Sequence, residues 1–185
     1  MAQVVDGKWQ LVPSGVRTVE TGYDRTIAFG DVTWSDYQVT VPVTVHSLSS
    51  TAPHAGVGVA AGWQGHAGAE RPRLDWPLGS LCFYYRRFVD DPYQLHLMQF
   101  ASPMYVAADG GQTQLALGVE HVLKLRAEVL SDTETRYSCK LWPSSTSEPQ
   151  DWSVSAVLAR RPGSVLLVAH HADLTFGNVV VEPLR

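Results

Sequence analysis

Aromatic and polar side chains of the kinds that bind saccharides are concentrated between positions 63 and 99. Aromatic rings stack on the C–H faces of sugars, and amide, imidazole and guanidinium groups hydrogen-bond sugar hydroxyls. We therefore predict a ligand-binding face that includes Trp63, Gln64, His66, Arg73, Trp76, Tyr84, Arg86, Gln94 and His96. The alternative is that both tryptophans are core side chains and that the polar groups are only solvated.

Acid–base catalysis has a candidate pair in the same stretch. Gln94 and His96 are two residues apart in a strand-like run, so they share a strand face. A glutamine and a histidine placed in this way can neutralise a uronate carboxylate and move a proton, as β-elimination of a polysaccharide requires. Hydrolysis is not favoured, because a retaining glycosidase needs two carboxylates about 5–5.5 Å apart and the acids from Glu128 to Glu134 run into a predicted turn. We assign no catalytic residue.

Residue spacing does not indicate metal or thiol chemistry. His170 and His171 are adjacent, so they are expected to point to opposite faces of a strand and not to share one ion with Asp173. We expect core or hydrogen-bonding histidines instead. Cys82 and Cys139 match no metal-ligand spacing, and each lies in a strand-like run. We expect two buried free thiols in preference to a disulfide.

Short β-rich runs must position these residues, because glycine, proline, aspartate and serine clusters separate them throughout the chain. In the clearest run, apolar residues occupy alternate positions: Tyr37, Val39, Val41, Val43 and Val45. A period of two fits a strand and no helix. Pro42 lacks a backbone N–H, which predicts that this strand is an edge strand or is bulged near its centre. We predict an all-β, antiparallel two-sheet β-sandwich of jelly-roll type, since stacked sheets manage many strand edges.

The composition predicts a single domain over residues 1–185. Of these residues 45% are hydrophobic and 17% are charged, enough to bury a core and too little charge for disorder. A formal net charge of −4 without a basic stripe argues against a nucleic-acid partner. No apolar run approaches the roughly 20 residues that span a bilayer, so we expect no membrane insertion. No signal-peptide pattern is visible, and an extracellular location is expected only for a domain excised from a longer secreted chain.

Four segments together resemble the concanavalin A-like lectin/glucanase superfamily, in its laminin-G-like branch. They are residues 30–39 with the pattern Trp34-x-Asp36-Tyr37-x-Val39, residues 58–66, residues 137–152, and residues 163–181 with the pattern Phe176-x-Asn178-Val179-x-Val181. The resemblance covers roughly residues 9–183. It implies a concanavalin A-like sandwich in which the first and last strands pair, here residues 7–12 and 178–182.

The resemblance also implies a range of ligands and activities, because this superfamily includes lectins, carbohydrate-binding modules, hydrolases and lyases. Its domains often hold a structural Ca²⁺ near the first and last strands. Asp6 and Asp173 are the acids available for it, but Gly177 stands where the pattern more often has Asp, so we predict no metal and no cofactor.

The hydrolase pattern Glu-x-Asp-x-x-Glu and two strands of the lyase pattern are absent. We therefore expect a non-catalytic carbohydrate- or surface-binding module of a larger or secreted bacterial-type protein, with a glycan or polysaccharide as partner. The alternative is a small polysaccharide-active enzyme, a lyase or a glycoside hydrolase, with its site on the concave sheet face.

Overall fold

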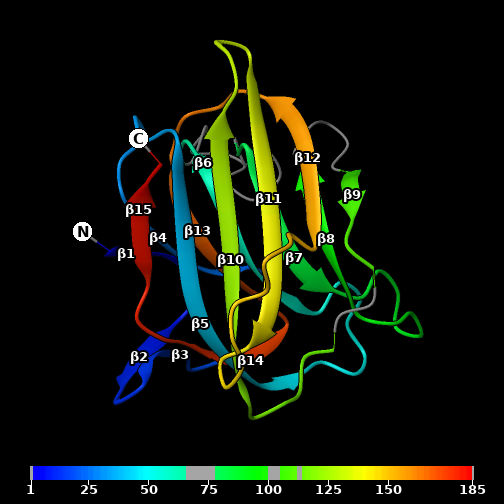
Figure 1. Ribbon diagram of the computed structural model, residues 1–185. Helices are drawn as coiled ribbons and strands as arrows, with labels where there is room; N and C mark the ends of the chain where they lie inside the picture. Colours follow the sequence, from blue (N-terminus) through cyan, green and yellow to red (C-terminus); the bar gives the residue numbers. More distant parts are fainter. Residues whose placement is uncertain (1, 66–77, 100–104, 112–113, 185) are drawn as a thin grey trace.

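The computed structural model describes residues 2–65, 78–99, 105–111 and 114–184, and within these ranges every regular element is a β-strand (Figure 1). One sheet has seven strands in the order β1 (Ala2–Asp6), β4 (Arg25–Phe29), β13 (Ser164–His170), β6 (Gly56–Trp63), β7 (Ser80–Tyr85), β8 (Gln94–Gln99) and β9 (Tyr105–Asp109). All of its pairings are antiparallel. This confirms the all-β prediction.

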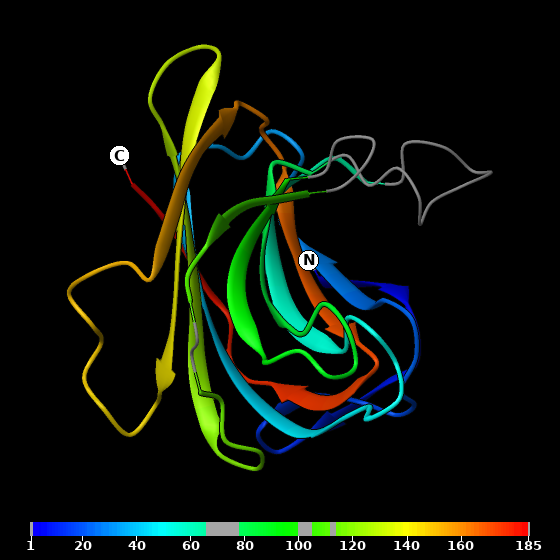
Figure 2. The ribbon, with the colours of Figure 1, turned by 90° about the vertical axis from the view of Figure 1, so that its right-hand side faces the viewer.

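The second sheet has eight strands and is also antiparallel throughout. Its order is β12 (Val154–Ala159), β11 (Glu134–Pro143), β10 (Glu120–Val129), β5 (Tyr37–Leu48), β14 (Ala172–Phe176), β3 (Gly15–Thr18) and β2 (Trp9–Val12), and β15 (Val180–Pro183) also pairs with β5. The two sheets stack face to face, as Figure 2 shows from the side. The chain is therefore a two-sheet sandwich, as predicted.

The core lies between the sheets and follows the alternation in the sequence. The alternating apolar residues of β5 are all buried, and they pack with inward residues of β10 and β11 against those of β6, β7, β8 and β13. Burying this much apolar surface is the main favourable term in folding. The seven-stranded sheet also buries apolar residues on its outer face, which form a second cluster that includes Leu81, Phe83, Tyr85, Met98 and Leu166.

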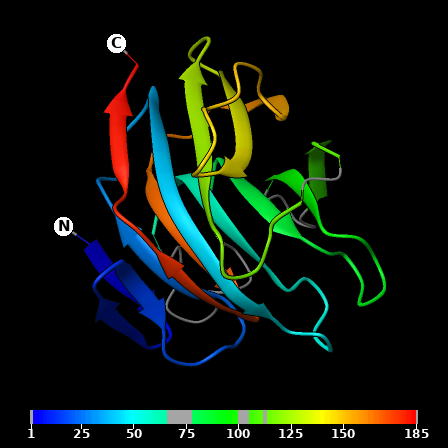
Figure 3. The same ribbon diagram turned by 60° about the horizontal axis from the view of Figure 1, so that its bottom comes forward.

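The first alternative predicted for Pro42, an edge strand, was wrong, because β5 lies in the interior of its sheet. The second, an irregularity near the strand centre, agrees with one side only, where the pairing passes from β14 at Val43 to β15 at Thr40. It pairs along one side with β10 and along the other with β14 and then β15 (Figure 3). Pro42 is paired in register with Val122 of β10, and its carbonyl accepts the N–H of Gly177 at 2.7 Å. Its ring nitrogen therefore faces the short gap between Phe176 and Val180, where β14 has ended and β15 has not begun. A missing donor costs nothing at a gap in the ladder.

The expected pairing of the first and last strands is also wrong. β1 pairs with β4, β2 forms a hairpin with β3, and β15 pairs with β5. The turn between Val12 and Gly15 closes the β2–β3 hairpin locally, and β14 and β15 run in succession along one edge of β5. Residues 9–12, which the resemblance expected to pair with the last strand, therefore pair with β3 in a local hairpin.

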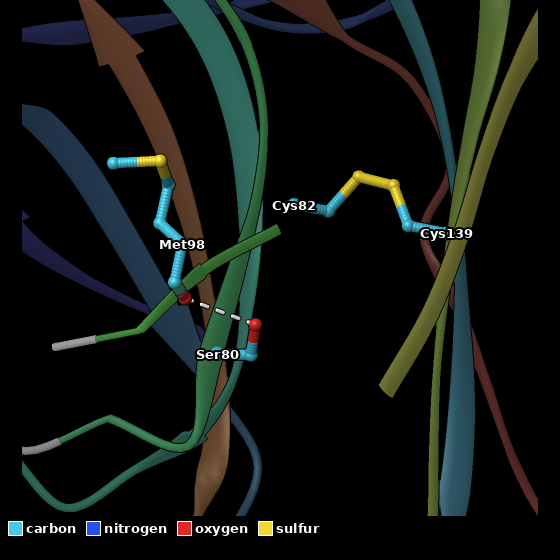
Figure 4. Close-up of a disulfide and its surroundings, with 4 residues drawn as sticks. All are labelled: Ser80, Cys82, Met98 and Cys139. Atoms are coloured by element: carbon cyan, nitrogen blue, oxygen red, sulfur yellow. Dashed lines mark hydrogen bonds between the residues drawn. A yellow bond between two sulfur atoms is a disulfide. The ribbon is translucent and has the colours of Figure 1, made fainter. Parts of the chain in front are cut away.

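The two cysteines form a disulfide across the core, which corrects the expectation of free thiols. Cys82 on β7 and Cys139 on β11 point toward each other from opposite sheets (Figure 4), and their Cα atoms are 6.1 Å apart, within the range that a disulfide spans. Figure 4 also shows Met98 pointing away from the bond, toward the outer face of the seven-stranded sheet. The positions of Cys82 and Cys139 in sequence could not reveal this, because stacking of the two sheets brings them together.

Candidate functional site

Histidine and aromatic side chains gather on the outer face of the seven-stranded sheet. They lie at the end of the sheet where β7 and β13 finish and β6 and β8 begin. We call this set the histidine–aromatic patch, and its members are Tyr23, Asp24, His54, Phe83, Tyr85, His96, His170 and His171.

Strand alternation and two glycines place the rings on the floor of the patch. Cys82 and Tyr84 of β7 face the core, so Phe83 and Tyr85 face outward. Their rings are stacked with centroids 4.7 Å apart. Opposite them in register, β6 has Gly58 and Gly56, and a Cβ atom at Gly58 would lie 2.9 Å from the Phe83 ring. Glycine therefore leaves the space that the rings occupy.

The rings continue across the sheet in both directions from this pair. The His96 ring lies 5.1 Å from that of Tyr85, and the His170 ring lies 6.3 Å from that of Phe83. Tyr23 packs edge-on against His170 at 4.6 Å. Phe83, Tyr85, His96 and His170 are buried, whereas Tyr23 is 49% exposed. The patch thus has a buried aromatic floor and an accessible aromatic rim.

Three histidines of the patch, His54, His96 and His171, favour the neutral state. Burial lowers the pKa of His54, His96 and His171 below the usual value, and the neighbouring His170 lowers the pKa of His54 and His171 further. Burial also raises the pKa of Tyr85. A neutral imidazole has one N–H donor and one lone pair that accepts. Near pH 7 these groups can therefore both donate to and accept from a polar, uncharged ligand.

Two histidine nitrogens show why the polar groups of the patch are not all satisfied internally. His170 Nδ1 lies 2.6 Å from Asp24 Oδ1. His96 Nδ1, in contrast, is buried and makes no hydrogen bond in the described part of the chain. The Oδ1 atom of Asp109 lies 3.7 Å from it, which is too far for a hydrogen bond. Buried polar groups are normally paired. An unpaired one on the outer face of a sheet indicates a site that a ligand or water completes.

The backbone around the patch is unusual in its conformation. Asp24, His54 and His171 have φ values of 49°, 60° and 50°, and the described residues include one further non-glycine with positive φ, Asp36. Such conformations cost about 1–3 kcal/mol and cluster at functional sites. The left-handed turn at His171 also overturns the prediction that His170 and His171 face opposite ways, because their rings lie 4.6 Å apart.

The structure places the predicted site residues in different surroundings. Gln94 and His96 share the outer face, because Leu95 and Leu97 point into the core. Trp63 is buried in the outer-face apolar cluster. The exposed Gln64 uses its amide to donate to the carbonyls of Val32, at 3.1 Å, and of Pro162. His66, Arg73 and Trp76 lie outside the described residues.

Tyr84 and Arg86 lie away from the patch. Tyr84 is in the core and stacks on Tyr93 at 5.5 Å. Arg86 donates to the carbonyls of Val89 and Ser49, both at 2.6 Å, and so ties two loops together. The sequence analysis selected Tyr84, whereas Tyr85 is the tyrosine of this pair that faces the patch. It did not include the patch members Tyr23, Asp24, His54, Phe83, His170 and His171 in the predicted ligand-binding face. A disulfide at Cys82 would have revealed which residues of β7 face inward.

The two acids that the resemblance implies for Ca²⁺ do not fit a shared site. Asp6 is on β1 of the seven-stranded sheet and accepts from Arg25 Nη1 at 2.9 Å. Asp173 is on β14 of the other sheet and accepts from Arg17 Nε and Nη2 at 2.9 and 2.7 Å, which holds the pKa of this carboxyl below its usual range. Among the described residues no group of three or more His, Cys, Asp or Glu could hold a metal ion. Each carboxylate is instead neutralised by its own arginine.

Known proteins are similar to this chain in structure and not in sequence. No family model and no curated protein matches it. The exoplasmic/lumenal domain of VIP36 in its Ca²⁺/Man3GlcNAc-bound form is similar over 100% of this chain and 85% of that chain, with a TM-score of 0.61 and 10% identity. The chain has a concanavalin A-like fold.

Two further lectin structures support this fold. A legume lectin-like domain from Entamoeba histolytica covers 100% of this chain and 90% of its own, with a TM-score of 0.60 and 8% identity. The metal-free form of lectin I-B4 from Griffonia simplicifolia covers 98% and 92%, with a TM-score of 0.59 and 7% identity. The concanavalin A-like sandwich predicted from the sequence is confirmed. Within the described ranges, no helix has the length and apolarity needed to cross a bilayer.

Proposed function

We propose that this concanavalin A-like domain is a glycan-binding module and that the histidine–aromatic patch is its site. The observation that carries the proposal is the combination, on one sheet face, of the exposed Tyr23 ring, the neighbouring His170 imidazole and the His96 imidazole, whose Nδ1 has no hydrogen bond among the described residues. Sugars present C–H faces and hydroxyls together, and they are recognised by rings and uncharged polar groups together. The structurally similar VIP36 domain has a Ca²⁺/Man3GlcNAc-bound form, which supports the same ligand class.

Each part of the patch has a role in this proposal. Tyr23 is 49% exposed and stands beside His170, so its ring stacks on the C–H face of a sugar residue. His170 on β13 and His96 on β8 are separated in the sheet by β6 and β7, so they hydrogen-bond hydroxyls of different sugar residues of one oligosaccharide. The buried Phe83–Tyr85 pair supports these side chains from below, and no net charge is required of the ligand.

Binding to immobilised glycans and NMR titration with Man3GlcNAc test the proposal. Tyr23→Ala should weaken binding roughly tenfold, because stacking of one ring contributes about 1–2 kcal/mol. Tyr105→Ala is the matched control, since Tyr105 is 48% exposed and lies on β9 outside the patch. Equal loss of affinity in both variants, or retention of full affinity in Tyr23→Ala, would place the site elsewhere.

A second candidate function is β-elimination of a uronate polysaccharide. Tyr85 and Gln94 are directly opposite in the β7–β8 register, and His96 lies on the same face. A tyrosine, a glutamine and a histidine together supply the proton carrier and the carboxylate neutraliser that elimination needs. Incubation with polyuronates should then generate unsaturated uronate absorbance that Tyr85→Phe abolishes. Binding of a polyuronate without absorbance leaves the binding module as the function.

We also propose that the domain operates in an oxidising compartment, as a secreted module would. The support is the fully buried disulfide between Cys82 and Cys139, since disulfides persist outside the reducing cytosol. The test is alkylation of the denatured, unreduced protein isolated from its native source, followed by mass spectrometry. No alkylated cysteine is expected, and two alkylated cysteines would contradict the proposal.

A further inference from the structure

His170 and Asp24 form a hydrogen-bonded pair whose proton position follows from chemistry. His170 Nδ1 and Asp24 Oδ1 are 2.6 Å apart, and their side chains are 9% and 13% exposed. An ionised carboxylate can only accept, so the shared proton belongs to Nδ1. When the ring is neutral, Nε2 therefore carries a lone pair and no hydrogen.

That second nitrogen is available to a ligand. His170 Nε2 makes no hydrogen bond to any residue that the structure describes, and it is not among the buried unpartnered atoms of those residues. The rings of Tyr23 and His171 stand edge-on to His170, each at 4.6 Å. The His170 ring that carries Nε2 is thus flanked by two rings, and one of them, Tyr23, is half exposed.

We propose that Asp24 is a positioning residue that fixes the Nδ1–H tautomer of His170, so that Nε2 accepts a hydrogen bond from a hydroxyl of the bound glycan. The inference rests on the proposed function and specifies the chemistry of its site. Carboxylates that hold an imidazole in one tautomer are a recurrent device wherever the second nitrogen must bind something. Asp24 does not touch the glycan and acts through His170.

The backbone is in the left-handed region at Asp24 and directly after His170. Asp24 has φ of 49°, and His171, on the other side of His170, has φ of 50°. The backbone is therefore in a disfavoured conformation at Asp24, which carries the carboxylate, and at His171, directly after the imidazole of His170. Strain of this kind persists only when surrounding interactions hold it. Asparagine tolerates left-handed φ nearly as well as aspartate, so Asp24→Asn leaves the backbone in place.

The charged groups around His170 set the direction of the pH dependence. Asp24, directly before β4, His171, His54 before β6, and Tyr23 interact with His170. Arg25 acts on His171, and Arg87 after β7 acts on His54. Burial and repulsion from His170 keep His54 and His171 neutral to lower pH than usual. Protonation of His170 converts Nε2 from an acceptor to a donor, so binding that uses its lone pair weakens on acidification.

Imidazole ¹⁵N NMR and glycan titration test the role of Asp24 together. In the wild type, His170 should show a proton on Nδ1 and a free lone pair on Nε2. In Asp24→Asn the two tautomers should mix, because an amide can accept from Nδ1 or donate to it. Affinity for Man3GlcNAc near pH 7.5 should then fall about twofold when the two tautomers are equally populated, because the apparent affinity scales with the fraction of the binding-competent tautomer.

Asp132→Asn is the charge-matched control, because Asp132 is fully exposed on the β10–β11 hairpin. It should change neither the His170 signals nor the affinity for Man3GlcNAc. A wild-type His170 protonated on Nε2, or an Asp24→Asn variant with unchanged tautomer and affinity, would overturn the inference. Absence of any Man3GlcNAc-induced shift in the wild type counts against the proposed function, and the tautomer of His170 then decides the role of Asp24.

Discussion

Two regions on opposite outer faces of the sandwich use similar residue types in different ways. On the eight-stranded sheet, Lys140 of β11 is 4% exposed and its Nζ lies 2.8 Å from Glu148 and 2.5 Å from the Pro149 carbonyl. The same nitrogen lies 5.7 Å from the centre of the Trp142 ring and 4.6 Å from that of Trp152. We call these residues the Lys140 cage. The histidine–aromatic patch on the other sheet has rings and polar groups too.

The difference between the regions is in how completely their polar groups are paired. In the Lys140 cage the buried charge has a carboxylate, a carbonyl and two rings, so it holds residues 143–153 against the sheet. In the patch a buried imidazole nitrogen is unpaired among the described residues, and three backbone positions are left-handed. A saturated cluster stabilises the fold, whereas an unsaturated and strained one indicates a ligand site. Residue type alone does not separate the two.

The largest expected effect follows from breaking the bond that connects the regions. Cys82 precedes Phe83 of the patch, Cys139 precedes Lys140 of the cage, and the disulfide joins them across the core. The Cys82→Ala/Cys139→Ala variant should lose about 4 kcal/mol of unfolding free energy, because the bond closes a 57-residue span in the unfolded chain. Urea unfolding measures the loss. A loss below about 1 kcal/mol would mean that the sheets hold together without it.

Lys140→Met tests whether the cage is purely structural. The variant keeps the length of the side chain and removes the buried charge, so it should cost about 2 kcal/mol of unfolding free energy. Lys124→Met is the control, because Lys124 also binds Glu148, at 2.9 Å, but its Nζ lies over no aromatic ring in the part of the chain that the structure describes. It should cost less than about 1 kcal/mol. Neither variant should alter glycan affinity, and a change in affinity would show that the cage takes part in binding.

Acidification should weaken the patch before it weakens the cage. The folded pKa values of His54, His96 and His171 are lowered, whereas unfolded histidine titrates near about 6.5. Below that pH the unfolded chain binds more protons, so the unfolding free energy falls as pH falls.

The cage responds at lower pH. Lys140 holds the pKa of Glu148 below its usual range. The contribution of Glu148 to the unfolding free energy is therefore complete above the pKa of glutamate in the unfolded chain, and it is lost only as pH falls through the lowered pKa of the folded state. The melting temperature should therefore decrease between pH 7.5 and 5. It should decrease less in a His54→Asn/His171→Asn variant, and an identical decrease in both proteins would assign the effect to other groups.

Removal of divalent cations should have the smallest effect, because the two acids considered for a cation site, Asp6 and Asp173, are each paired with an arginine. The melting temperature and Man3GlcNAc affinity should be the same with and without EDTA, since only a ligand that binds the native state raises stability. A decrease of several degrees in EDTA would reveal a cation site and reopen the resemblance to Ca²⁺-bound lectins.

The sequence by itself determined the fold class and much of the core. The alternation from Tyr37 to Val45 defined β5, because a period of two buries one face of a strand whatever its neighbours are. The sequence also placed Gln94 and His96 on one face of β8, because they are two residues apart in the same strand. These are properties of local backbone geometry, and local patterns contain them.

Only the tertiary structure decided which strands are neighbours and which face of β7 is outside. Pro42 lies in an interior strand because β14 and β15 divide one edge of β5 between them. The Cys82–Cys139 bond and the His170–Asp24 pair join residues that are distant in sequence. Phe83 and Tyr85 form the floor of the patch because the partner of Cys82 lies across the core. Contacts between sheets and loops leave no periodic signal in one sequence, so the fold positions the site in a way that the sequence alone does not show.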